Sequence, residues 1–162
     1  MDDTRERLDR LEAIEDIKLL IAEFSRGTDR HNDPEVTRRV FSEDAIWSSP
    51  QYGHYEGLEA IVEATSRGGR EIILWSLHFM VSPIIKVDPA SRTATANWYL
   101  WEPMKTRHPD GEIADTWFGA TYDAHLRKTD GVGWQIFKLT LDAKLLAKVG
   151  EAWPGDIQAK QV

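Results

Sequence analysis

The chain has 162 residues, of which 41% are hydrophobic, enough for one globular domain with a buried core. It contains no cysteine, which excludes disulfides, thiolate metal sites and cysteine nucleophiles and fits a reducing compartment. The formal net charge is −7 and the basic residues are scattered, which argues against nucleic acid or an anionic membrane as a partner and favours a neutral or weakly charged small molecule.

The beginning of the chain, MDDTRERLDRLEAIED, is acidic and lacks the apolar segment of a signal peptide. The longest apolar runs are too short to span a membrane. We therefore expect a soluble, cytoplasmic protein that does not bind membranes.

Apolar residues spaced by three and four predict an amphipathic helix over about 13–29. The predicted buried stripe consists of Leu11, Ile14, Ile17, Ile21, Phe24 and Thr28. Asp29 ends this helix at the edge of the buried face. Because a helix C-terminus carries partial negative charge, a carboxylate there is disfavoured unless a positive group pairs with it.

Two further helices and a strand follow. Asp33-Pro34, an N-cap acid followed by proline at the first helical position, predicts a second helix that ends near Phe41. After a turn, a strand begins at Ala45. Gly57 introduces a third helix, which we expect to stop at Gly68-Gly69.

From about residue 76 the hydrophobic period changes to two. We predict strands at 76–87, 92–105, 113–128 and 133–145, separated by turn signals at 88–91, 109–111 and 130–131. Helices followed by an antiparallel meander predict an α+β domain, with the helices packed on one face of a curved sheet. The domain is expected to cover residues 1–148, and 149–162 to form a C-terminal tail.

His78 and Asp29 are the candidate catalytic residues. In the predicted strand His78 shares a face with Met80 and Ile84, and the opposite face is apolar too, so we expect it to be enclosed. It is either a core histidine bonded to a backbone carbonyl or a proton acceptor. Asp29 is either a solvated acid or its partner. A carboxylate and an imidazole that meet in an apolar cavity form a proton-abstracting dyad that needs neither metal nor cofactor.

Aromatic residues supply the material for such a cavity. The chain has seven Trp, four Tyr and five Phe. They either fill a large core or line a concave pocket, which would suit flat or ring-bearing apolar ligands. The candidate pocket residues are Phe24, Trp47, Tyr52, Tyr55, Trp75, Met80, Trp98, Trp101 and Phe118.

No sequence motif indicates a cofactor or a metal. The chain lacks a phosphate-binding glycine loop, a dinucleotide fingerprint, a G-x-S-x-G elbow and an H-E-x-x-H helix. No two histidines lie on adjacent turns of one helix. His125 alternates with apolar neighbours and is expected to face outward, with a second pocket histidine as the alternative.

Several motifs in sequence order resemble the SnoaL-like branch of the NTF2-like superfamily. They are a helix ending in Asp29, Asp33-Pro34, F-x-x-D-A-x-W at 41–47, G-x-x-A-I at 57–61, Leu77-His78, and D-G-x-x-W-x-I-x-K-L at 130–139. The likeness extends from about Ala13 to Lys144. It implies a cone-shaped α+β barrel, in which three N-terminal helices pack on a curved, mostly antiparallel sheet.

Within that superfamily the chain is most similar to the group of bile-acid 7α-dehydratase, hexachlorocyclohexane dehydrochlorinase and scytalone dehydratase. These enzymes carry an Asp and a His at the positions of Asp29 and His78. The resemblance implies that His78 is a general base and that Asp29 orients it and stabilises the imidazolium. It further implies a homo-oligomer, with a trimer preferred and a dimer as the alternative.

One position departs from that pattern. Five residues before the dyad Asp, the bile-acid enzyme has a Tyr and the dehydrochlorinase a Lys, whereas this chain has Phe24, which cannot donate a proton to a leaving group. Isomerisation, or elimination of a good leaving group, depends less on a proton donor. The residues that would replace the donor are Tyr52, Tyr55, Tyr99 or Lys144.

The expected function is a cofactor-independent lyase, dehydratase-like, or an isomerase acting on a hydrophobic, cyclic small molecule such as a polyketide- or steroid-like compound. Two alternatives remain open. The noncatalytic small (β) subunits of ring-hydroxylating dioxygenases share this fold, and would co-purify with a larger iron-containing chain. A small-ligand-binding NTF2-like domain would bind without turnover.

Overall fold

The computed structural model describes residues 3–90 and 92–151, which form three helices and seven strands. The elements are α1 (Asp3–Thr28), α2 (Pro34–Val40), β1 (Phe41–Ser49), β2 (Gly53–Glu56), α3 (Leu58–Glu71), β3 (Ile73–Ser76), β4 (Phe79–Asp88), β5 (Thr93–Arg107), β6 (Ile113–Thr129) and β7 (Gly133–Lys148). The predicted α+β class is confirmed. From residue 152 onward, the predicted tail lies outside the described residues.

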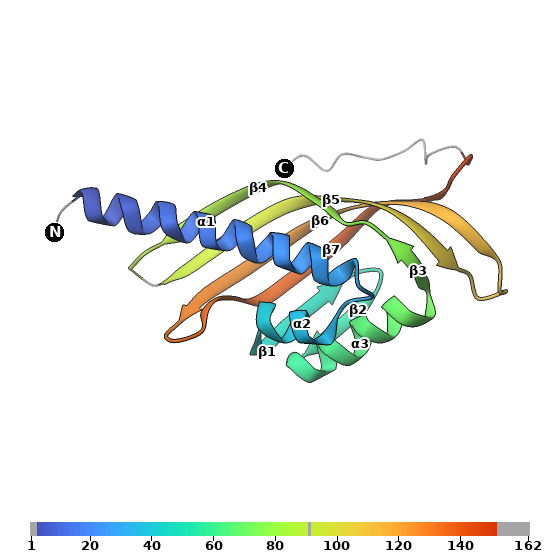
Figure 1. Ribbon diagram of the computed structural model, residues 1–162, viewed down its shortest axis with the longest axis horizontal. Helices are drawn as coiled ribbons and strands as arrows, with labels where there is room; N and C mark the ends of the chain where they lie inside the picture. Colours follow the sequence, from blue (N-terminus) through green and yellow to red (C-terminus); the bar gives the residue numbers. More distant parts are fainter. Residues whose placement is uncertain (1–2, 91, 152–162) are drawn as a thin grey trace.

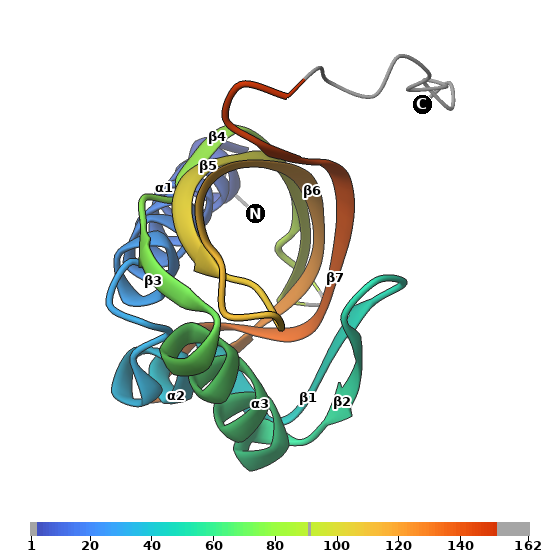
Figure 2. The ribbon, with the colours of Figure 1, turned by 90° about the vertical axis from the view of Figure 1, so that its right-hand side faces the viewer.

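One mixed sheet holds the strands in the order β2-β1-β7-β6-β5-β3, and β4 pairs with β5 as well. The β1–β7 pair is parallel, and the other pairs are antiparallel. The long strands β5, β6 and β7 curl strongly when viewed end-on (Figure 2). Helix α1 runs along β4, while α2 and α3 gather near β1 (Figure 1).

Strict alternation along β5 and β6 decides which side chains enter the core. Even-numbered residues such as Trp98 and Tyr122 are buried, while their odd-numbered neighbours lie on the outer face. Helix α1 adds Ile17, Ile21 and Phe24 to the same continuous core cluster. Burial of each such large apolar side chain contributes about 1.5–3 kcal/mol.

Helix α1 begins at Asp3, well before the predicted start. Its first turns carry the ion pairs Arg5–Asp9 and Glu6–Arg10, both at 3.5 Å with i,i+4 spacing, which stabilise an exposed helical segment. Leu11, expected in the buried stripe, is 64% exposed. No helix in the two described ranges is long and apolar enough to cross a membrane.

Helix α3 continues through Gly68-Gly69 to Glu71, so the predicted stop was wrong. A Cβ atom at Gly69 would lie 2.6 Å from the carbonyl oxygen of His31. The Gly69 carbonyl oxygen lies 2.9 Å from Nδ1 of His31. The glycine therefore serves close packing of α3 on the turn between α1 and α2.

The strand predicted over 76–87 is divided into β3 and β4, with Leu77 and His78 between them. In addition, β4 contains a bulge. Val81 pairs with Tyr99 and Ile84 with Asn97, so two residues of β4, Ser82 and Pro83, oppose one residue of β5. Ser82 has a φ of 54°, and proline has no N–H to donate to the ladder.

Candidate active site

His78 lies at the break between β3 and β4, which pair with the same edge of β5. Ser76 is opposite Met104 and Phe79 is opposite Trp101. The Leu77 N–H donates to the carbonyl of Pro103 at 3.2 Å. This register sets His78 opposite Glu102.

The end of α1 binds the backbone of His78. The hydroxyl of Ser25 donates to the His78 carbonyl at 2.5 Å, and Oδ1 of Asp29 accepts from the His78 N–H at 2.7 Å. The N–H and the carbonyl of His78, which lies between the two strands, are thus both hydrogen-bonded by side chains at the end of α1. These two bonds fix the position of the imidazole relative to α1.

Asp29 also bonds to the imidazole ring. Its Oδ1 lies 3.0 Å from Nδ1 of His78, and the His78 side chain is 7% exposed and that of Asp29 26% exposed. The two residues singled out in the sequence therefore meet. If Nδ1 carries the proton that Asp29 accepts, Nε2 is the ring nitrogen left to accept a proton.

The surroundings of Asp29 favour its charged form. Burial acts to raise the pKa of Asp29, but the hydrogen bonds from the His78 ring and backbone outweigh it, and the charges of His78 and Arg30 act in the same direction, so the pKa is lowered. An ionised Asp29 is the group required to stabilise a protonated imidazole.

Glu102 was missed in the sequence. Its side chain is 4% exposed, and Oε1 lies 3.3 Å from Nε2 of His78. Burial raises the pKa of Glu102 and the charge of Asp29 adds to this, against the charge of His78 and a hydrogen bond from Ser76. The available signal was the alternation in β5, where Glu102 has the same parity as Trp98 and is thus directed to the interior.

The two carboxylates contact opposite nitrogens of one ring, so the three side chains do not converge on a single point. Consistent with this, the described part of the chain contains no group of three or more His, Cys, Asp or Glu residues able to hold a metal ion. The arrangement suits proton transfer.

Most of the predicted pocket residues belong to the interior or its rim. Those that do are Phe24, Trp47, Tyr52, Tyr55, Met80, Trp98 and Phe118. Phe24 packs edge-on against Tyr122, with ring centroids 5.9 Å apart, so the position without a proton donor is filled by a core aromatic ring. Tyr52 packs against Phe118 at 6.1 Å.

Two predicted pocket residues lie on the outer face instead. Trp101 is paired with Gly119 and stacks on Trp117, with centroids 5.4 Å apart. Trp75 is exposed and opposite Lys105. Because neighbouring residues in a strand point to opposite faces, the inward direction of Glu102 turns Trp101 outward.

Two of the residues considered as replacement proton donors are also remote from the interior. Tyr99 is on the outer face of β5 and 59% exposed. Lys144 is exposed and paired with Asp142 at 2.5 Å. The hydroxyl of Tyr55 donates to the carbonyl of Tyr52 at 3.0 Å.

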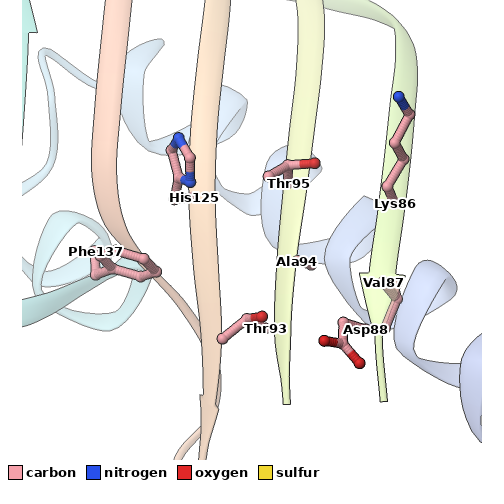
Figure 3. A pocket seen from close by; sticks show the side chains of 8 residues that line it. All are labelled: Lys86, Val87, Asp88, Thr93, Ala94, Thr95, His125 and Phe137. Atoms are coloured by element: carbon pink, nitrogen blue, oxygen red, sulfur yellow. The ribbon is translucent and has the colours of Figure 1, made fainter. Parts of the chain in front are cut away.

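His125 faces outward, as expected. It lines a hollow of about 360 Å³ across β4 to β7, where its ring lies on the same face as Lys86 and Phe137 (Figure 3). A second hollow, of about 410 Å³, lies between Trp75 and Trp117. Neither hollow includes the Asp29–His78 pair.

These helices on a curled mixed sheet, with a carboxylate and an imidazole joined at the helix end, define a cone-like α+β protein. The sequence profile of the SnoaL-like domain matches residues 9–140, most of the chain, and the protein therefore belongs to the SnoaL-like family. No curated protein matches the chain.

Solved structures show the same fold. Hexachlorocyclohexane dehydrochlorinase LinA-type3 from Novosphingobium barchaimii superposes with a TM-score of 0.76 at 18% identity, covering 90% of this chain and 96% of that one. A scytalone dehydratase-like protein from Novosphingobium aromaticivorans gives 0.73 at 18% identity, covering 98% and 99%. An NTF2-like protein from Salmonella enterica gives 0.72 at 19% identity, covering 88% and 99%. The resemblance to the SnoaL-like branch of the NTF2-like superfamily is confirmed.

Proposed function

We propose that the protein is a cofactor-independent lyase or isomerase that removes a proton from a carbon atom of a hydrophobic, ring-bearing small molecule. His78 is the general base and Asp29 its positioning residue. The observation that carries this proposal is the 3.0 Å hydrogen bond between Oδ1 of Asp29 and Nδ1 of a largely buried imidazole. The fold shared with a dehydrochlorinase and a scytalone dehydratase-like protein supports it.

The proposed step begins with neutral His78. Nδ1–H donates to Asp29, so Nε2 presents a lone pair and takes the substrate proton. The electron pair of the broken C–H bond moves into a new double bond, and either a leaving group departs or the proton is returned elsewhere. The positive charge that forms on the ring is stabilised by the neighbouring carboxylate. A positioned base of this kind contributes about 10²- to 10⁴-fold to the rate.

The interior residues support the assignment of substrate class. Trp47, Trp98 and Phe118 are buried aromatic side chains of one cluster. Such surroundings suit a flat, uncharged ring. A carboxylate-bearing substrate would meet the two acids Asp29 and Glu102 beside the imidazole.

The ring opening of 5-nitrobenzisoxazole tests the proposal, because this reaction requires only removal of a carbon-bound proton by a base in an apolar site. We expect the wild-type protein to accelerate it and His78→Gln to lose about 10²-fold or more in kcat/KM. The matched control is His125→Gln, which removes an imidazole from the outer face and should retain full activity.

Equal rates for wild type and His78→Gln would refute the proposal and favour a noncatalytic role. Circular dichroism and thermal melting show whether each variant is folded. His78→Ala with added imidazole is the second variant, and recovery of the rate with imidazole concentration is expected if the ring itself is the base.

A further inference from the structure

We propose that Glu102 is the proton donor of this site: it delivers its proton to the leaving group of the substrate and is then reprotonated by Nε2 of His78. The inference rests on the proposed function, because it gives Glu102 a part in the same proton transfer. It would fill the role that Phe24 cannot perform.

The geometry brings the acid to the reacting nitrogen. Oε1 of Glu102 lies 3.3 Å from Nε2 of His78, the ring atom not bound to Asp29. Within the described residues Oε1 has no hydrogen-bond partner, although the side chain is almost completely buried. The two atoms are therefore close enough for proton exchange, although the contact does not meet the geometry of a hydrogen bond. A buried carboxyl oxygen without a hydrogen bond destabilises the fold, and such groups are often retained because they have a catalytic role.

The groups around Glu102 favour a neutral carboxyl. Burial raises the pKa of Glu102, and the negative charge of Asp29, at the end of α1 beyond the imidazole, adds to this in smaller measure. From β6 and the turn after β1 it faces Tyr122 and Tyr52, whose own pKa values are raised by burial and by the charge of Glu102. Against these act His78 and a hydrogen bond from Ser76 on β3. No lysine or arginine contributes to the pKa of Glu102.

The proton balance closes within the three residues. The proposed step starts from an ionised Asp29, a neutral imidazole and a protonated Glu102. Nε2 takes the proton from carbon, the double bond forms, the bond to the leaving group breaks, and the released electron pair takes the proton of Glu102. An imidazolium and a carboxylate remain side by side. Transfer of one proton from Nε2 to Oε1 across 3.3 Å restores the resting state.

Two benzisoxazoles with different leaving groups test this role. In both, the base removes the proton at C3, the C≡N bond forms, the N–O bond breaks, and the phenolic oxygen leaves. The 5-nitro compound releases a stable phenolate and needs no acid, whereas unsubstituted 1,2-benzisoxazole benefits from protonation. We expect Glu102→Gln to lower the rate of ring opening of the unsubstituted compound by about 10-fold or more. The rate for the 5-nitro compound should change by less than about threefold. Glu102→Asp keeps a carboxyl group on a shorter side chain, and it should retain part of the wild-type rate for the unsubstituted compound.

The matched control is Glu63→Gln, which removes an exposed acid of α3 and should leave both rates unchanged. Equal effects of Glu102→Gln on both compounds would overturn the donor role, even if His78→Gln shows that the base assignment holds. If His78→Gln keeps the wild-type rate with both compounds, the proposed function is refuted instead.

A measurement without substrate makes the inference testable even if neither compound reacts. In protein labelled with ¹³C at the glutamate carboxyl, the Glu102 signal is the one missing from Glu102→Gln. We expect it to titrate above the ordinary value of 4.5 and to respond to His78→Gln. Titration near that ordinary value in both proteins would overturn the donor role, because Glu102 would then be ionised at neutral pH.

Discussion

Asp29 and Glu102 contact opposite nitrogens of one imidazole, and their surroundings favour opposite protonation states. The pKa of Asp29 is lowered because the His78 hydrogen bonds and charges outweigh burial, whereas burial raises the pKa of Glu102. Two carboxyl groups whose environments separate their pKa values are the usual arrangement for one acid and one base in a single site.

Glu102→Gln should change the pH dependence of stability. Because the pKa of Glu102 is raised on folding, its protonated form contributes stability that is fully present below 4.5 and is lost as the pH rises through the folded pKa. An amide does not titrate. We expect the melting temperature of the variant to rise relative to wild type as the pH is raised from 4 to 8, measured by thermal denaturation. A constant difference across this range would contradict the raised pKa.

Asp29→Asn should behave in the opposite sense. Because the pKa of Asp29 is lowered on folding, its ionised form contributes stability above 3.8, which is lost as the pH falls through the folded pKa. The variant should therefore be less stable than wild type at neutral pH, and the two should converge in acid. Comparison of urea unfolding at pH 7 and pH 3 measures this. A deficit that persists unchanged in acid would show a packing defect.

At the level of elements, the bulge in β4 decides which residue of β5 meets His78. Counted from the pair Asp88–Thr93 without a bulge, His78 would be opposite Pro103, but the extra residue at Ser82-Pro83 shifts the partner to Glu102. A shift of one residue also exchanges the inner and outer faces. The turn that follows Asp88 was predicted from its sequence. The bulge was not predicted, although Pro83 within the strand pattern was an available signal for it. Asp29 and His78 were found, and Glu102 was missed.

The adjacent glycines of α3 provide a matched pair of substitutions. Gly69→Ala would place a methyl group 2.6 Å from the His31 carbonyl oxygen, whereas at Gly68 no atom lies within 4 Å. We expect Gly69→Ala to lower the free energy of unfolding by about 1–3 kcal/mol. Gly68→Ala should raise it by about 0.5–1 kcal/mol, because alanine is the better helix former. Urea denaturation measures both, and equal effects would contradict the close approach of α3 to the turn.

For the whole molecule, the hydrophobic periods predicted the helices and strands that form the two layers. The mixed character of the sheet was not predictable, because the parallel β1–β7 pair joins strands far apart in the sequence. The expectation that Trp75 and Trp101 line the pocket was wrong, because the alternation that directs Trp98 and Glu102 inward directs Trp101 outward, and Trp75 is exposed opposite Lys105.

The outer face carries an apolar patch formed by Phe79, Val81 and Tyr99, which are exposed and adjacent in the β4–β5 pairing. Such a patch is typical of association surfaces, and we expect a second copy of this chain to cover it. Tyr99→Asp should dissociate the assembly without loss of secondary structure, as measured by analytical ultracentrifugation. Thr95→Asp, on the same strand and face, is the control. A monomeric wild-type protein would refute this expectation.

The most direct test of the dyad is the double-mutant cycle of Asp29→Asn and His78→Gln, measured as kcat/KM for 5-nitrobenzisoxazole. If Asp29 acts through the imidazole that it holds at 3.0 Å, the double variant should be as slow as His78→Gln alone. Independent losses that multiply in the double variant, or no loss in any of the three variants, would contradict a general-base role for His78 positioned by Asp29.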